Sequence, residues 1–321
     1  MFELIETIVL VFGIVALGYL SGILKVLPVE TGTQLSKFVF TIAVPTLLFR
    51  TMISADFALG VPWSLWGAYF AGVFSTWALG HIVMRRVFGR DARAGVVAGL
   101  AASFSNLVLI GIPLILGVFG QEGFEILSLI ISIHLLVMMG TTVVLFEWGV
   151  RADGVQTGSV EFVAVAQRFV ANLFSNPIVV GILAGWAWRF SGLPLPGLAD
   201  KLTAQIASVA GPVALFAIGL ALIQFGFRSN FRQALATASV KLFFMPTVVL
   251  GAGLFVGLPP LALQVAVASA ALPSGANPYL IATHFGTGQG LASNAMTIGT
   301  AISAGSVLVW LLIVQTIAPI T

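Results

Sequence analysis

The chain has 321 residues, of which 59% are hydrophobic and only 8% are charged, and its net charge is +3. Soluble domains are roughly 45–50% apolar and about 25% charged, so this composition excludes a water-soluble globular protein and predicts an integral membrane protein. The sequence has no cysteine, which excludes disulfides, thiolate metal sites and cysteine nucleophiles. The basic residues stand at the ends of apolar runs, so the charge does not indicate a nucleic-acid partner.

Apolar runs long enough for transmembrane helices, about 20 residues each, follow one another along the whole chain. We predict an all-α polytopic membrane protein with ten transmembrane helices, and the lipid bilayer is its first expected partner. The predicted spans cover residues 4–24, 34–53, 62–84, 94–119, 124–147, 172–190, 204–225, 233–257, 260–285 and 292–316.

The Lys and Arg residues of the connections predict the orientation. With the N-terminus outside, ten of them fall in cytoplasmic connections and three in outer connections, as expected because positive residues are enriched on the cytoplasmic side. Both termini are therefore expected outside the cytoplasmic (inner) membrane of a bacterial-type cell. The longest connection, residues 148–171, is expected to be a cytoplasmic linker, and a plain solvated linker is favoured over a regulatory segment.

The chain is expected to consist of two related halves, residues 1–147 and 172–321, with five spans each. The stretch Ala43-Val-Pro45-Thr-Leu-Leu48-Phe49 of span two is matched by Ala210-Gly-Pro212-Val-Ala-Leu215-Phe216 of span seven. Because five is an odd number, the second half enters the membrane from the opposite side, which makes an inverted repeat. Such repeats hold their substrate near the midplane, between the halves.

Spans four and nine are interrupted by helix-breaking and polar residues where the middle of the membrane is expected. Proline removes a backbone donor, and freed backbone groups cannot face lipid, so both breaks are expected to face protein or a water-filled cavity. We interpret the breaks as a substrate-binding site, because half-helix N-termini that meet at the midplane attract anions. The predicted site residues are Asn106, Gly111, Pro113, Pro273, Gly275, Asn277 and Pro278.

Each residue type has an expected role in this site. Pro113 and Pro278 fit the first position of the second half-helices, where a missing N–H is tolerated. The glycines let the backbone turn and approach a ligand, and the Asn side chains can hydrogen-bond a carboxylate or an amide. The alternative is a pair of ordinary proline kinks, with each Asn bonded to a neighbouring helix.

Two further residues are candidates for charge or coupling. Lys241 lies nine residues beyond Arg232, which places it about 13 Å into the membrane, where it could pair with a substrate anion or replace a coupling cation. The alternative is that its side chain extends to the cytoplasmic surface. His134 lies in the middle of span five and could carry a proton, although a satisfied interior histidine is the commoner case.

Neither a cofactor nor a metal is expected, and none of the eleven acidic residues lies convincingly at mid-membrane. Coupling to protons or to sodium is therefore left open. No Ser, His and acid set has the flanking sequence of a hydrolase, so we do not expect an enzyme.

Three stretches resemble the auxin efflux carrier family of membrane transporters, which includes plant auxin exporters and bacterial permeases. They are Phe38-Val-Phe-Thr-Ile-Ala-Val-Pro45, Asn106-Leu-Val-Leu-Ile-Gly111-Ile-Pro113 and Ala270-Ala-Leu-Pro273-Ser-Gly275-Ala-Asn-Pro278. The resemblance implies a bile-acid-symporter-like elevator fold, in which spans 1, 2, 6 and 7 form a scaffold and spans 3–5 and 8–10 form a transport domain. It also implies organic anions as cargo, a possible homodimer through the scaffold, and a site at Asn106 and the prolines of both breaks.

The chain departs from the family at Thr283-His284 and at the Gly286–Gly290 turn, and it lacks the long cytoplasmic loop of the plant carriers, which favours a bacterial-type permease. The predicted function is secondary transport of a small organic carboxylate by elevator-type alternating access. The alternatives are a passive channel or uniporter of the same fold and a membrane-embedded sensor module.

Overall fold

The structure, a computed structural model, describes residues 2–54, 62–154, 175–225 and 230–320. Within these ranges every regular element is a helix, and the β-type pairing is a single bridge between Ser105 and Ser274. Six helical stretches of the described chain are long and apolar enough to cross a membrane, and three shorter apolar helices are α5 (Ala92–Ser103), α8 (Pro177–Ser191) and α13 (Pro260–Ala271). The chain therefore has the fold of an all-helical polytopic membrane protein, and the finer prediction of ten spans stays a prediction.

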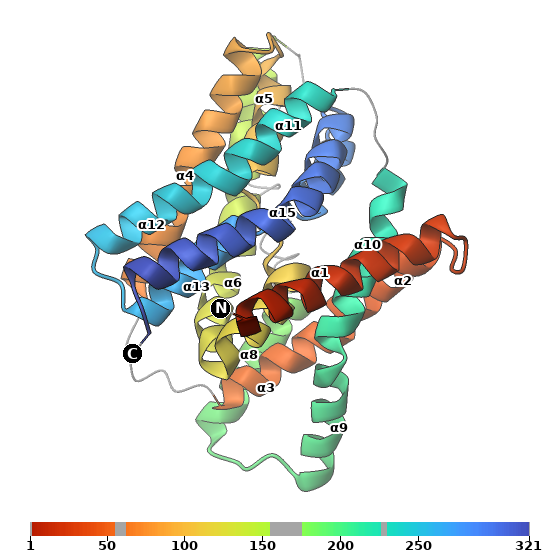
Figure 1. Ribbon diagram of the computed structural model, residues 1–321, viewed down its shortest axis with the longest axis vertical. Coiled ribbons are helices and arrows are strands. Elements are labelled where there is room, and N and C mark those ends of the chain that lie inside the picture. The colour runs from red at the N-terminus through yellow and green to blue at the C-terminus, as the bar shows by residue number, and fades with distance from the viewer. Residues whose placement is uncertain (1, 55–61, 155–174, 226–229, 321) are drawn as a thin grey trace.

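One group of helices comes from predicted spans 1, 2, 6 and 7 (Figure 1). It comprises α1 (Phe2–Ile23), α2 (Glu30–Phe38), η1 (Val39–Ala43), α3 (Val44–Ser54), α8 (Pro177–Ser191), α9 (Gly197–Ser208) and α10 (Ala210–Phe225). Within it α1 packs along α10 and α3 packs along α8. Glycines permit these close contacts, since a Cβ at Gly219 would overlap the Val15 carbonyl oxygen and one at Gly181 would lie 2.5 Å from that of Pro45.

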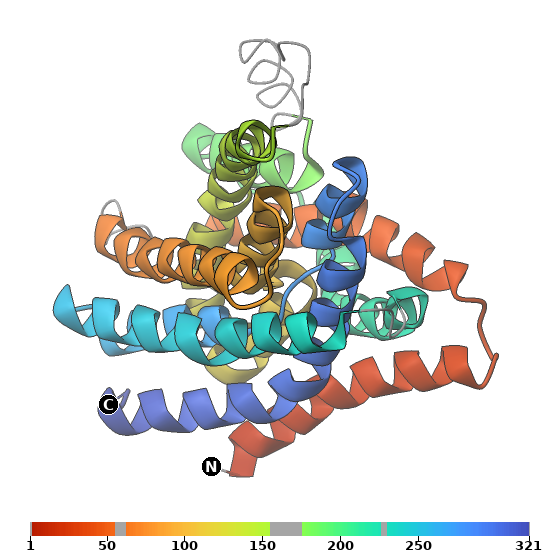
Figure 2. The same cartoon turned by 90° about the horizontal axis from the view of Figure 1, so that it is seen from above.

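The second group holds the interrupted spans and occupies the upper left part of Figure 1. It comprises α4 (Trp63–Arg86), α5 (Ala92–Ser103), η2 (Leu107–Gly111), α6 (Ile112–Ala152), α11 (Phe231–Ser239), η3 (Val240–Phe244), α12 (Met245–Phe255), α13 (Pro260–Ala271), α14 (Asn277–His284) and α15 (Gln289–Ile317). Here α4 packs against α5 and α12, and α13 packs against α6 and α15. The two groups meet where α1 runs beside α15 and where α10 contacts η2 (Figures 1 and 2).

The long helix α6 is two helices joined at Gly120, whose φ of 63° and ψ of −156° are not helical. A positive φ is readily adopted by glycine, which has no Cβ. The chain therefore changes direction there, between the predicted fourth and fifth spans. The cytoplasmic linker predicted at residues 148–171 lies mostly outside the described residues, and only its start, through Gly154, is seen.

Each of the π-helical turns η1, η2 and η3 lies just before a proline. The turns η1, η2 and η3 end at Ala43, Gly111 and Phe244, and each is followed two residues later by Pro45, Pro113 or Pro246. A proline ring inside a helix clashes with the carbonyl four residues before it. A wider turn ahead of the proline relieves that clash and keeps the helix continuous, and single π turns of this kind are frequent at functional sites.

Candidate functional site

The two interrupted spans meet at their breaks. Helix α5 ends at Ser103 and the chain becomes helical again at Leu107, while α13 ends at Ala271 and α14 begins at Asn277. The Asn106 N–H donates a 2.9 Å hydrogen bond to the Pro273 carbonyl oxygen, next to the bridge between the two serines. The breaks thus satisfy part of each other's backbone inside the protein, as a break within a membrane requires.

Asn106 is the residue that both ends the break and restarts the helix. Its side-chain oxygen accepts a 3.2 Å hydrogen bond from the Leu109 N–H, which makes it the N-cap of η2. Its side-chain nitrogen, Nδ2, is buried and has no partner among the described residues, and the same holds for the Ser274 hydroxyl. A buried donor without an acceptor costs roughly 1–3 kcal/mol, so Nδ2 is a candidate donor to a bound molecule or an ordered water.

Gly111 and Gly275, the two glycines of the predicted site, do not take a left-handed conformation. The Gly111 N–H bonds the Asn106 carbonyl oxygen at 3.0 Å, and a Cβ there would lie 2.8 Å from the Leu272 side chain. Gly275 lies against Asn106, with its nearest contacts at ordinary distances. Gly111 therefore serves close packing between the breaks, whereas a Cβ would fit at Gly275. The predicted approach of their backbone to a ligand stays a prediction.

Pro113, Pro278 and the second asparagine occupy the helical side of the breaks, while Pro273 lies within the second break. Pro278 is the second residue of α14, next to half-buried Asn277, which agrees with a place in the first turn. Pro113 is also in the first turn of α6, but the expectation that it starts the half-helix is wrong. The wide turn η2 precedes it, so the half-helix begins at Leu107 under the Asn106 cap.

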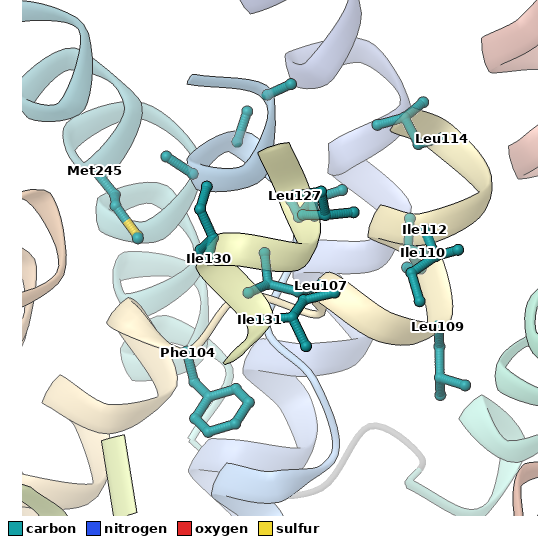
Figure 3. Close-up of a cluster of buried hydrophobic side chains, with 14 of the residues drawn as sticks. Phe104, Leu107, Leu109, Ile110, Ile112, Leu114, Leu127, Ile130, Ile131 and Met245 are labelled. Carbon is teal, nitrogen blue, oxygen red and sulfur yellow. The ribbon is translucent and has the colours of Figure 1, made fainter. Parts of the chain in front are cut away.

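Apolar side chains enclose the first break. Figure 3 shows Phe104, Leu107, Ile110 and Leu127 gathered around it, and all four are buried. Such a lining excludes water and lowers the local dielectric, which strengthens the hydrogen bonds made by the few polar groups inside it.

Lys241 lies directly against both breaks. Its Nζ donates hydrogen bonds to the Ser105 hydroxyl (2.9 Å) and to the Ala270 carbonyl oxygen (2.5 Å), and the Met245 sulfur lies 3.2 Å away. The side chain is 1% exposed, so it does not extend to the membrane surface. The Ala270 contact is also favourable electrostatically, because the C-terminal end of a helix carries partial negative charge.

His134 is buried near the same break. Its Nδ1 lies 3.4 Å from the Tyr69 hydroxyl, its ring meets that of Phe104 with centroids 4.9 Å apart, and its Nε2 has no partner in the described chain. The Tyr69 hydroxyl in turn interacts with the Ser105 side chain. Sequence reasoning missed Tyr69 and Ser105; a tyrosine in mid-span and a serine beside Asn106 were the available signals.

A cavity of about 670 Å³ lies where the two helix groups meet. It runs between α1, α10 and the first turns of α6, and its wall includes Glu3, Glu6, Thr7, Pro113, Ser208 and Gly211. Small residues bring the groups together at its edge, since a Cβ on Gly211 would come 3.3 Å from Pro113. The cavity therefore reaches the helical side of the first break.

The residues that the structure describes contain no group of three His, Cys, Asp or Glu side chains that could hold a metal ion. One carboxylate does have a defined role outside the spans. Asp153 accepts hydrogen bonds from the N–H groups of Ala92 (2.7 Å) and Arg93 (3.1 Å) and from the Arg93 guanidinium (3.0 Å). It ties the end of α6 to the start of α5.

Apolar helices interrupted at a shared, buried polar break define the class of the protein, a polytopic membrane transport protein. The chain matches the family described as "Membrane transport protein" over residues 3–311, and it belongs to that family. The resemblance to auxin efflux carriers is thereby confirmed.

Three relatives cover nearly the whole chain. An uncharacterized transporter from Methanothermobacter thermautotrophicus is 25% identical over 95% of this chain and 96% of the relative. A putative malonate transporter from Rhizobium meliloti is 26% identical over 92% of this chain and 91% of the relative. Auxin efflux carrier component 8 from Arabidopsis thaliana is 22% identical over 92% of each chain.

Proposed function

We propose that the protein is a secondary transporter for a small organic anion, a mono- or dicarboxylate, which binds where the two interrupted helices meet. The observation that carries this proposal is the buried Asn106 side-chain nitrogen, which has no partner among the described residues. A carboxylate oxygen is the acceptor that would satisfy it, and hydrogen bonds to a charged acceptor are the stronger ones. The name of the relative from Rhizobium meliloti, a putative malonate transporter, supports a carboxylate as cargo.

The proposed site draws on both breaks. Asn106 would bind the carboxylate, and Gly111, Pro113, Pro273, Gly275, Asn277 and Pro278 would shape the space around it. Helix N-termini at η2 and α14 would add favourable electrostatics for an anion. Lys241 would supply positive charge behind the break, through its hydrogen bond to Ser105.

The proposed mechanism is alternating access of the elevator type. The group with α1, α3, α8 and α10 would act as the scaffold, and the group with the breaks would move against it. Close packing within each group supports this division, and the cavity where α1 and α10 face α6 is a candidate entry path. An inverted repeat of residues 1–147 and 172–321 and a homodimer through the scaffold are part of the same proposal.

A thermal-shift screen of carboxylates on the purified protein tests the binding step, with and without sodium and across pH. A ligand that binds the folded state raises its melting temperature. In vesicles, Asn106→Ala should strongly reduce transport while the protein stays folded in the membrane, and unchanged transport would refute the site. Counterflow driven by unlabelled substrate separates a carrier from a passive channel, in which it does not occur.

A further inference from the structure

A chain of polar groups leads from Lys241 away from the proposed anion site. The Lys241 Nζ bonds the Ser105 hydroxyl at 2.9 Å, the Ser105 side chain interacts with the Tyr69 hydroxyl, and that hydroxyl lies 3.4 Å from the His134 Nδ1. All four residues are buried. We call these four residues, Lys241, Ser105, Tyr69 and His134, the buried relay.

The buried relay faces few other ionisable groups. Helices α12, α13 and α15, which pack around Lys241, contain no ionisable side chain. On α4 and α6 the ionisable groups that face it are Tyr69 and His134, and His134 is within electrostatic range of Lys241. The charged residues of α5 and α11, Arg93 and Arg232, stand in the first turns of those helices, well away from η3.

The contacts of Lys241 are compatible with two protonation states. Two hydrogen bonds to oxygen use two N–H groups, and a neutral amine has two while an ammonium has three. The third neighbour, the Met245 sulfur, is only a weak acceptor. These contacts therefore do not need the positive charge, whereas a carboxylate bound beside Ser105 would be stabilised by it.

Burying one charge in an apolar region is costly unless an opposite charge accompanies it. We propose that each anion enters its site together with one proton, which the buried relay holds, so that the protein is a proton–anion cotransporter. This inference rests on the proposed function of the same site. The proton comes from water and binds the Lys241 amine as the carboxylate binds at Asn106, and both return to water on the other side of the membrane.

His134 gives the buried relay a second place for the same proton. Its Nε2 has no partner among the described residues, and Tyr69 and Ser105 connect its ring to Lys241. Charges on His134 and Lys241 together would repel each other, so the relay holds one proton and not two. A monoanion then crosses without moving net charge, while a dianion moves one negative charge.

The test uses the purified full chain with potassium malonate and potassium propionate as probes, titrated calorimetrically between about pH 7 and pH 8.5, where both probes stay ionised. Comparing two buffers with different ionisation enthalpies counts the protons taken up. We expect about one proton per bound anion, and a roughly tenfold loss of affinity for each pH unit as the relay loses its proton. Binding to the wild-type protein without proton uptake would overturn the proposal.

Two variants test whether the proton uptake depends on the Lys241 amine. Lys241→Arg keeps a permanent positive charge, so we expect it to bind anion without proton uptake and without pH dependence. Lys241→Met should bind weakly, and any proton that it still takes up must reside on His134. Should either variant fail to fold, the wild-type proton count still decides. If neither probe nor any other carboxylate binds, the proposed function itself is wrong. Binding with an affinity that does not depend on pH refutes only the coupled proton uptake.

Discussion

Asn106 performs two tasks with two different atoms, and two substitutions separate them. Its Oδ1 caps η2 through the Leu109 N–H, while its Nδ2 is the proposed donor to the substrate carboxylate. Asn106→Asp keeps an oxygen at the capping position but removes the donor and adds a negative charge. Asn106→Ala removes both the cap and the donor.

The expected magnitudes follow from these contacts. Loss of an N-cap costs about 1 kcal/mol of stability, so Asn106→Ala should melt earlier than the wild type and Asn106→Asp should not lose that contribution. A hydrogen bond to a charged group contributes about 1.5–3 kcal/mol, which corresponds to roughly 10- to 150-fold weaker anion binding for Asn106→Ala. In Asn106→Asp, two like charges about 4 Å apart add close to 4 kcal/mol of repulsion at an effective dielectric of 20, so binding should fall by a further factor of about 10³.

The assay is a thermal melt of each variant with and without a carboxylate that shifts the wild-type protein. The predicted order of ligand-induced shift is wild type, then Asn106→Ala, then Asn106→Asp with none. An undiminished ligand shift in Asn106→Asp would refute the reasoning, because a carboxylate could not then occupy the space beside Nδ2.

Two further predictions concern stability. Gly219→Ala places a methyl group on the Val15 carbonyl, so it should lower the free energy of unfolding by about 1–3 kcal/mol, which is measured as a lower melting temperature. The matched control is Gly13→Ala on the partner helix α1, where the added methyl group faces open space, and it should show no such loss. Burial raises the pKa of the Asp153 carboxyl, but the Ala92 and Arg93 N–H groups and the Arg93 guanidinium outweigh it and hold that pKa below its ordinary value. Asp153 therefore stabilises the folded protein at pH values above the pKa that its carboxyl has in the unfolded chain, and this stabilisation is lost as pH falls through the lower pKa of the folded state. The melting temperature of the wild type should drop more steeply below about pH 5 than that of Asp153→Asn. Parallel melting curves for the two proteins would contradict this role.

Features that depend on composition and local pattern could be predicted from the sequence. The scarcity of charge predicted an all-helical membrane protein, and Pro113 and Pro278 predicted where two spans would be interrupted. The depth of Lys241 in its span marked it as unusual. These inferences succeed because the length of an apolar run and the backbone donor missing from a proline act within one segment and do not depend on distant parts of the chain.

Features that depend on contacts between distant segments could not be predicted. The bond from Asn106 to Pro273 joins two breaks that are far apart in the chain, and the partner of Lys241 on the first break, Ser105, lies 136 residues before it. The start of the half-helix at Leu107 was missed because the proline pattern outweighed a weaker local signal, an asparagine in a capping position. Tyr69 was missed because one tyrosine in an apolar span has no periodicity to mark it.

The wide turn at η3 makes the direction of Lys241 depend on the length of the chain as well as on its residues. A π turn holds one residue more than an α-helical turn, and Pro246 fixes where that extra residue sits. Deleting Leu242 or Phe243 would let the turn rewind and rotate the preceding helix by about 100° relative to α12. The Lys241 amine would then point away from Ser105, although every side chain of the site would still be present in the sequence.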